Sequence, residues 1–402
     1  MSCPDLKDPR QRTEALHARR ARKMARSAHA YVRGSTDKFY EWLGSGAKRI
    51  LPDGPPVWIC GDCHLGNIGP LADADGRIEL LVRDFDQTVI GNPAHDLIRL
   101  ALSLAMAARG SDLSGITTAQ MLENMVDAYA GACEDHARST PEEAHVVQRV
   151  LMDAHRRGWK QLARERARGN VTRLPKGRKF IPLRGDERAA IEALAGSADI
   201  HRLATRLARR EDATQVELLD AAYWVKGCSS LGRARYALLL DVGGLASRDR
   251  DFCLLDIKEA TRAIAPRAEG APMPRNNGDR VVAGATAISP ALGERMVAAS
   301  VLGQSVVARE LLPEDLKVEV ERLTGAEAVK LARALAVVIA TAHARQMNLG
   351  DRARWHKEML RSRPRSIEVP SWLWRAVTDL IAIHERAYLE HCRSLLAQVA
   401  RP

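Results

Sequence analysis

The feature that most constrains this chain is a strand–turn–strand pattern within residues 61–86, with polar segments at both of its ends. Its turn, at residues 73–76, carries Asp, Ala and Gly between two apolar stretches, which is typical of a β-hairpin. In a hairpin centred on that turn, residues whose numbers sum to about 150 face each other, so Asn67 lies within a step of Asp84. The sequence therefore predicts that the two ends of the pattern meet in space.

The polar ends of this hairpin carry residue types that suit phosphoryl transfer. They are Gly61-Asp62-Cys63-His64-Leu65-Gly66-Asn67 and Arg83-Asp84-Phe85-Asp86. An Asp followed five positions later by an Asn is the spacing of the kinase catalytic loop, where the Asp accepts a hydroxyl proton and the Asn holds magnesium. Asp62 is thus the candidate catalytic residue. Asn67 and Asp84 are candidate magnesium ligands, and Asp86 is either a second carboxylate ligand or a structural acceptor.

A second group of candidates follows a shift toward strand-forming residues near position 220. Residues 226–232, here called the glycine turn, lie between two strand candidates, so their backbone N–H groups can approach phosphate oxygens. The next strand candidate ends at Lys258, where a kinase places its phosphate-binding lysine. A hinge-like segment follows at residues 308–312. The candidate nucleotide-binding residues are Gly227, Ser229, Ser230, Gly232, Lys258, Glu310 and Leu311.

Helical and strand periodicities divide the rest of the chain. We expect a charged helix over residues 11–32 that ends at Gly34, and a short strand at 57–60. Further helices are expected from Leu97 through Met106 and at 117–138, 141–168 and 186–210; strands at 223–225, 236–240 and 252–258; a short helix after the Pro/Gly/Asn stretch 266–279; two strands within 296–311; and long helices from about 326 onward.

Bulk composition indicates a folded chain with more than one core. It has 402 residues, 46% of them hydrophobic and 28% charged, and single cores stop growing below about 300 residues. The apolar stretches are too short to span a bilayer, and the N-terminus lacks the apolar core of a secretory signal. The seven cysteines are odd in number and scattered, so we expect reduced thiols and a cytoplasmic location.

The chain is basic, with a formal net charge of +11, which attracts anionic partners without choosing among them. Basic residues cluster between Arg156 and Arg184. This cluster is interpreted either as a solvated surface or as a binding surface for an acidic ligand. Aromatic residues are only 4% of the chain, too few for a base-stacking surface, so nucleic acid is not the expected partner.

Three motifs give the chain a family resemblance. Residues 61–67, Asp84-Phe85-Asp86 and Asn92-Pro93-Ala94-His95-Asp96-Leu97 resemble the motifs of aminoglycoside phosphotransferases and choline kinases, with Cys60 in place of the leading His. The whole chain more closely resembles a bacterial family catalogued as domain of unknown function 2252. Its Lys-Glu-Ala and Arg-Val-Val segments appear at 258–260 and 280–282, but no substrate comes with the resemblance.

The resemblance implies an α+β, two-lobed, protein-kinase-like fold with its halves in swapped order. Kinases run from glycine loop through lysine and hinge to catalytic loop and metal-binding Asp, whereas here the cycle starts at the catalytic loop. Such a circular permutation is tolerated where natural termini lie close together. The expected parts are a helical part at 1–214 with the catalytic loop and metal-binding hairpin, a β-rich nucleotide-binding part at 215–320, and completing helices at 321–402.

Several of these residues also have structural interpretations. Asp62, Asn67 and Asp84 are common turn-capping types, and Asp96 is expected to bond the backbone of the catalytic loop. Lys258 needs an acidic partner, for which Asp279 and Glu269 are the two options. Cys60 and Cys63 form a C-x-x-C sequence followed by His64, a pattern of redox or zinc sites, but no fourth zinc ligand is evident.

We therefore expect an enzyme that uses ATP and Mg²⁺ to phosphorylate an unidentified hydroxyl acceptor, a small molecule or a protein. Transfer of AMP instead of phosphate stays open. One alternative is a metal-dependent phosphoesterase with two metals on Asp62, His64, Asp84 and Asp86. Another is a non-catalytic, pseudokinase-type binding protein.

Overall fold

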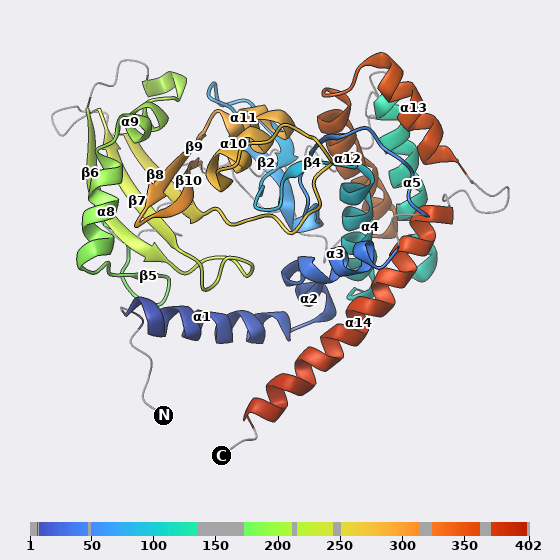
Figure 1. Ribbon diagram of the computed structural model, residues 1–402, viewed down its shortest axis with the longest axis horizontal. Helices are drawn as coiled ribbons and strands as arrows, with labels where there is room; N and C mark the ends of the chain where they lie inside the picture. The colour runs from blue at the N-terminus through green and yellow to red at the C-terminus, as the bar shows by residue number, and fades with distance from the viewer. Residues whose placement is uncertain are drawn as a thin grey trace.

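The chain is a mixed α+β protein, shown by a computed structural model (Figure 1) that describes residues 6, 8–46, 50–111, 113–134, 173–210, 215–243, 251–312, 324–361 and 371–399. Its helices are α1 (Pro9–Met24), α2 (Ala28–Gly34), α3 (Thr36–Gly44), α4 (Ala94–Arg109), α5 (Gly115–Glu134), α8 (Gly185–Ala195), α9 (Ala198–Ala204), α10 (Asn277–Ile288), α11 (Pro290–Gly293), α12 (Gly325–Ala344), α13 (Leu349–Leu360) and α14 (Ser371–Val399). Its strands are β1 (Val57–Ile59), β2 (Ile68–Ala72), β3 (Ile78–Val82), β4 (Val89–Gly91), β5 (Phe180–Ile181), β6 (Val216–Trp224), β7 (Arg235–Val242), β8 (Asp251–Glu259), β9 (Met296–Val301) and β10 (Gln304–Leu311).

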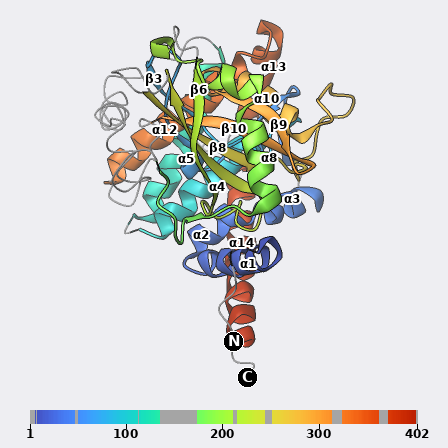
Figure 2. The same cartoon turned by 90° about the vertical axis from the view of Figure 1, so that its left-hand side faces the viewer.

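A six-stranded antiparallel sheet in the order β5-β6-β7-β8-β10-β9 forms one side of the molecule. Side chains alternate along β7, so Leu238 and Leu240 enter one apolar cluster while Ala237 and Leu239 enter another on the opposite face. Helices α8 and α9 cover the face of Leu238, and Figure 2 shows α8 lying over the strands.

The helices α4, α5, α12, α13 and α14 form the other side of the molecule (Figure 1). Helix α4 is buried over nearly its whole length, and α5 packs along α12. Two small two-stranded sheets, β1–β4 and β2–β3, lie beside these helices. The helical side is therefore assembled from segments early and late in the sequence.

Helix α1 spans the two sides (Figure 1). Leu16 on α1 is buried in the sheet-side core, and Arg12 forms an ion pair with Glu187 of α8. Farther along, the Nη2 group of Arg20 donates a 2.8 Å hydrogen bond to the carbonyl of Gly34 in α2. One helix thus ties the sheet to the helical side.

Two helix expectations and one boundary between the expected parts need adjustment. The helix expected over 11–32 is two helices, because the side chain of Ser27 caps α2 by accepting a 3.1 Å hydrogen bond from the N–H of Ala30. Ser197 likewise caps α9 and interrupts the helix expected over 186–210. Residues 173–210, expected with the helical part, contribute β5, α8 and α9 to the sheet side instead.

Other expectations are confirmed. The strands at 57–60, 223–225, 236–240, 252–258 and 296–311 are all present, as is the hairpin within 61–86. The helix expected at 141–168 and most of the basic stretch from Arg156 lie outside the described residues. Among the described residues, no helix has both the length and the apolarity needed to cross a membrane.

Candidate active site

The hairpin β2–β3 has the register that the sequence predicts. Ile68 lies opposite Val82, and the N–H of Arg83 donates a 2.8 Å hydrogen bond to the carbonyl of Asn67, which extends the ladder by one step. The positive φ of 84° at Gly76 closes the turn. The two polar ends of the hairpin are therefore held together by the backbone.

Asn67 fastens these two ends to each other. Its Nδ2 group donates hydrogen bonds to the carbonyl oxygens of Asp62, at 3.2 Å, and Asp84, at 3.1 Å. The predicted proximity of Asn67 and Asp84 is thus confirmed. The role of Asn67 as a magnesium ligand stays a prediction.

The carboxylate of Asp62 is held on both of its oxygens. Oδ1 accepts hydrogen bonds from Nε of Arg99, at 3.1 Å, and from Nη2 of the same guanidinium, and Oδ2 accepts one of 2.8 Å from Oγ1 of Thr36. Arg99 lies on α4 and is fully buried, whereas the Asp62 side chain keeps 17% exposure. The loop therefore presents a fixed carboxylate that still reaches solvent.

Asp96 braces the same loop from the first turn of α4. Its carboxylate accepts hydrogen bonds from the N–H groups of Cys60, at 2.7 Å, and Gly61, at 2.9 Å. His343 of α12 lies 3.3 Å from the same carboxylate, and Gln346 bonds the backbone of Trp58 in β1. The expected structural role of Asp96 is confirmed, and the late helix α12 reaches Asp96 through His343.

Lys258, on β8 of the large sheet, reaches across to the early hairpin. Its Nζ lies 2.9 Å from Oδ1 of Asp84 and 2.7 Å from Oδ2 of Asp86. These two acids pair with the lysine, rather than Asp279 or Glu269. A residue of the large sheet thus meets the metal-ligand candidates of the small hairpin.

The two carboxylates that share Lys258 differ in their ionisation. Partial burial opposes the charge on Asp84, but the ammonium of Lys258 and the nearby guanidinium groups of Arg309 and Arg235 hold the pKa of Asp84 far below its usual range. Burial and the adjacent charge of Asp84 raise the pKa of Asp86. Lys258 therefore contacts one carboxylate whose charge the site favours and one whose charge the site disfavours.

The glycine turn folds over this cluster. Gly227 and Gly232 have φ values of 81° and 91°, which favour glycine, and Nη1 of Arg233 lies 3.6 Å from Oδ2 of Asp86. The hydroxyl of Ser230 donates to the carbonyl of Lys226 and accepts from Arg235, so it is used within the turn. The structure thus brings the turn to the acids but leaves Ser230 only its backbone for a ligand.

The turn is also anchored from outside by α1. Nζ of Lys23 donates a 2.8 Å hydrogen bond to the carbonyl of Gly227. A Cβ at Gly232 would lie 2.1 Å from Cδ2 of His17, so this glycine permits close contact with α1. The N-terminal helix therefore fixes the shape of the turn.

The hinge-like segment lies away from these contacts. The carboxylate of Glu310 is buried and pairs with Arg210 at 2.9 Å, while its N–H and carbonyl bond Arg295. Leu311 is buried in an apolar cluster of the sheet. The side chains of these two predicted nucleotide contacts therefore do not join the cluster around Lys258.

Helix α10 supplies an arginine that the sequence analysis missed. Arg280 is buried, and its Nη2 donates hydrogen bonds to the carbonyls of Asp86, at 3.1 Å, and Thr261, at 2.8 Å. Arg99 was missed as well, although its place three residues after Asp96 on one helix offered a signal. Both arginines hold loop geometry that local sequence patterns do not encode.

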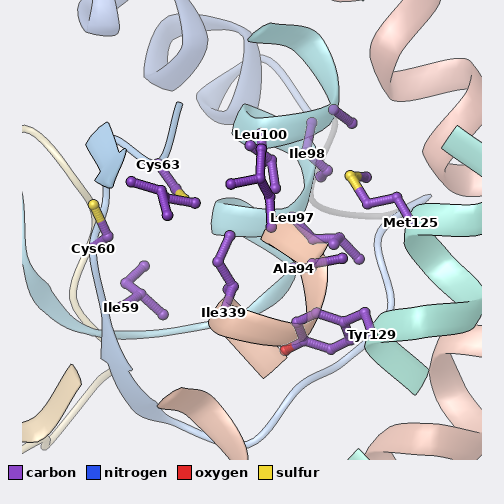
Figure 3. Close-up of a cluster of buried hydrophobic side chains, with 14 of the residues drawn as sticks. Ile59, Cys60, Cys63, Ala94, Leu97, Ile98, Leu100, Met125, Tyr129 and Ile339 are labelled. Atoms are coloured by element: carbon purple, nitrogen blue, oxygen red, sulfur yellow. The ribbon is translucent and has the colours of Figure 1, made fainter. Parts of the chain in front are cut away.

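The thiols of the C-x-x-C segment are buried in the helical core, next to Ile59 (Figure 3). Burial raises the pKa of both Cys60 and Cys63, which opposes the thiolate that zinc binding and redox chemistry require. The Sγ of Cys60 donates to the carbonyl of Asp84 at 3.4 Å. These cysteines thus pack the loop that carries Asp62 against the helical core.

The donor set fits magnesium bound jointly with phosphate. Within the residues that the structure describes, no group of three or more His, Cys, Asp or Glu side chains forms a metal cage. Asp84 and Asp86 nevertheless converge on one cation, and the Asp84 side chain is 43% exposed. Magnesium is commonly held by one or two carboxylates with substrate oxygens completing its shell, which this pair permits.

Sequence comparison places the chain in a family. Residues 12–394 match the model of the family described as "Uncharacterized protein conserved in bacteria (DUF2252)", and the chain belongs to that family. No curated protein and no solved structure shows significant similarity to it. That description names no activity, so the indications of function lie in the site itself.

Proposed function

We propose that this protein is an ATP- and Mg²⁺-dependent phosphotransferase with a two-lobed, kinase-like fold whose halves are swapped along the chain. The observation that carries the proposal is the position of Lys258, with Nζ 2.9 Å from Asp84 and 2.7 Å from Asp86. A lysine and a metal-binding Asp that grip the same triphosphate must lie this close, even though 174 positions separate Lys258 from Asp84.

The topology of the sheet supports the same proposal. Strands β6, β7 and β8 are consecutive and antiparallel, the glycine turn joins the first two, and Lys258 lies on the third. Protein kinases place their glycine loop and phosphate-binding lysine in this relation, on their first three strands. The catalytic loop and the metal Asp precede the sheet here, so the two orders are related by circular permutation.

In the proposed reaction, Asp62 orients the hydroxyl of the acceptor toward the γ-phosphorus of ATP. Its pairing with Arg99 fixes the position of the carboxylate, so orienting the acceptor is its main contribution. A bond forms between the acceptor oxygen and the γ-phosphorus while the bond to the β,γ-bridging oxygen breaks, and ADP leaves. The hydroxyl proton passes to Asp62 and then to solvent.

The remaining residues hold the nucleotide and its charge. Lys258 and the backbone N–H groups of the glycine turn contact the phosphates, and the positive φ values of Gly227 and Gly232 shape that turn. Asp84, Asp86 and Asn67 are the proposed holders of magnesium, which neutralises charge that develops on the phosphates when it is bound. Transfer of AMP would need the opposite orientation of the triphosphate in the same site.

Nucleotide binding tests the proposal directly. ATP with Mg²⁺ is expected to raise the thermal midpoint of the wild-type protein, because a ligand that binds only the folded state stabilises it by mass action. Lys258→Met is expected to lose most of that shift. Lys176→Met is the matched control, because Lys176 forms a comparable 2.7 Å ion pair with Asp220 away from the cluster.

Two results would contradict the proposal. If no nucleotide shifts the thermal midpoint of the wild-type protein, the phosphotransferase is refuted and a non-catalytic binding protein is favoured. Release of phosphate from esters without ATP would favour the phosphoesterase. Analysis of products with ATP labelled at the α- or γ-phosphate separates AMP transfer from phosphoryl transfer.

A further inference from the structure

The end of α2 places an arginine directly on the catalytic loop. Arg33 is half-buried, and a Cβ at Gly66 would lie 2.5 Å from its Nη2 and 2.8 Å from its Cζ. The guanidinium therefore packs closely against the loop that carries Asp62. Gly66 is the residue that permits this approach.

Arg33 has no counter-ion of its own in the described part of the chain, where no hydrogen bond or ion pair joins its guanidinium to another residue. The neighbouring arginines do have partners: Arg99 pairs with Asp62, and Arg20 donates to the carbonyl of Gly34. Both carboxylate oxygens of Asp62 are already used by Arg99 and Thr36. Partly buried charges are normally paired, so this unpaired cation points to a missing anion.

His64 supplies a second polar group at the same place. It lies two residues after Asp62, and its Nδ1 is buried without a hydrogen-bond partner among the described residues. His64 also lies two residues before Gly66, the residue that the Arg33 guanidinium contacts, so both side chains belong to the same short loop. A buried polar nitrogen without a partner is uncommon and indicates a ligand or water that completes it.

We infer that Arg33 and His64 form an anion-binding subsite beside Asp62, which takes a phosphate or carboxylate group of the acceptor. The inference rests on the proposed function, because Asp62 orients an acceptor only if group transfer occurs there. It narrows the acceptor from any hydroxyl compound to an anionic one. The planar fork of Arg33 suits bidentate binding of either group.

The γ-phosphate of the nucleotide is the other source of the same chemistry. The acceptor is the better assignment, because Lys258 and Arg233 already supply cations at the nucleotide side, next to Asp84 and Asp86. Arg33 instead contacts Gly66, on the loop between Asp62 and Asn67. The two sources predict different competition with nucleotide.

The first arm of the test uses inorganic phosphate alone, titrated calorimetrically at constant ionic strength. Wild type is expected to bind phosphate. Arg33→Ala is expected to raise the dissociation constant about tenfold or more, because a charged hydrogen-bonding group is lost. Arg26→Ala, which removes an exposed arginine seven positions earlier, is expected to change it less than about twofold. Equal binding by wild type and Arg33→Ala, or none by wild type, overturns the inference.

The second arm repeats the phosphate titration with magnesium and either ADP or β,γ-imido-ATP. Phosphate binding that persists with both nucleotides supports the acceptor subsite. If phosphate binds in the presence of ADP but not of β,γ-imido-ATP, the subsite holds the γ-phosphate of the nucleotide, and the inference is overturned. Failure of both nucleotides to bind refutes the proposed function, while the first arm still decides the subsite. If Arg33→Ala does not fold, Arg33→Lys and His64→Ala replace it. If both of these variants bind phosphate as tightly as wild type does, the subsite is refuted.

Discussion

Two neighbouring carboxylates at Lys258 should respond in opposite ways to the same substitution. Asp84→Asn and Asp86→Asn each remove one charge from the cluster, and Asn keeps the shape of Asp. The pKa of Asp84 is held far below its usual range, so the fold favours its charge. The pKa of Asp86 is raised, so the fold disfavours its charge. At pH 7 the first variant should therefore be less stable than wild type, and the second more stable.

The expected magnitudes are modest. The Asp84 side chain is 43% exposed, so solvent screens its ion pair, and we expect Asp84→Asn to lower the free energy of unfolding by about 1 kcal/mol. Asp86→Asn relieves burial of a charge and repulsion from Asp84, but it also loses the 2.7 Å contact with Lys258. We expect the free energy of unfolding to rise by about 0.5 kcal/mol, because the lost contact offsets most of the benefit.

The dependence on pH follows from the same directions. A depressed folded pKa means that Asp84 adds stability above about pH 4, the pKa of an unfolded Asp, and loses it as the pH falls. A raised folded pKa means that the charge of Asp86 lowers the stability of the fold at neutral pH, and that this cost disappears as the pH falls. The difference between the two variants should therefore shrink from pH 7 toward pH 3.

Thermal unfolding in a chelating, nucleotide-free buffer measures these effects without bound magnesium. Asp220→Asn serves as a control for the substitution itself, since Asp220 pairs with Lys176 at another place in the protein. Equal destabilisation by Asp84→Asn and Asp86→Asn, or a stabilising effect of Asp84→Asn, would show that Lys258 does not discriminate between the two acids as argued.

Three further predictions concern the elements that support the site. Asp96→Asn should lower the free energy of unfolding by about 2–3 kcal/mol in chemical denaturation, because it weakens buried charged hydrogen bonds to the loop; a change under about 0.5 kcal/mol would contradict this. Cys60 and Cys63 should resist an exposed-thiol reagent at pH 8 until the protein unfolds, since burial raises the pKa of both; rapid labelling of the native protein would be the contrary result. Gly232→Ala should loosen α1 and speed proteolysis there, because its Cβ would overlap His17 and its φ is 91°; an unchanged digestion rate would argue against that contact.

The hairpin is where sequence and structure agree best. Its turn residues and flanking apolar stretches fix a register of Ile68 opposite Val82, and the register alone brings Asn67 to Asp84. The sequence also predicted the strand that carries Lys258. These features are local, so turn chemistry and period-two alternation are sufficient to find them.

Side-chain partners that are far apart in the sequence could not be predicted in this way. The acids paired with Lys258 were sought near it, at Glu269 and Asp279, but they lie in the early hairpin. Arg280 reaches the carbonyl of Asp86 across 194 positions, and no periodicity encodes such a contact. Side-chain pairing between distant elements depends on the assembled fold, which local patterns do not specify.

The discontinuous make-up of the helical side has a consequence for synthesis of the protein. Helices α4 and α5 emerge from the ribosome long before α12 and α14, against which they pack. The large sheet, from β5 to β10, is translated in between and can pair its strands first. Asp96, which braces the loop at Cys60 and Gly61, therefore lacks its contact with His343 until α12 has been made, so the candidate site is completed late in translation.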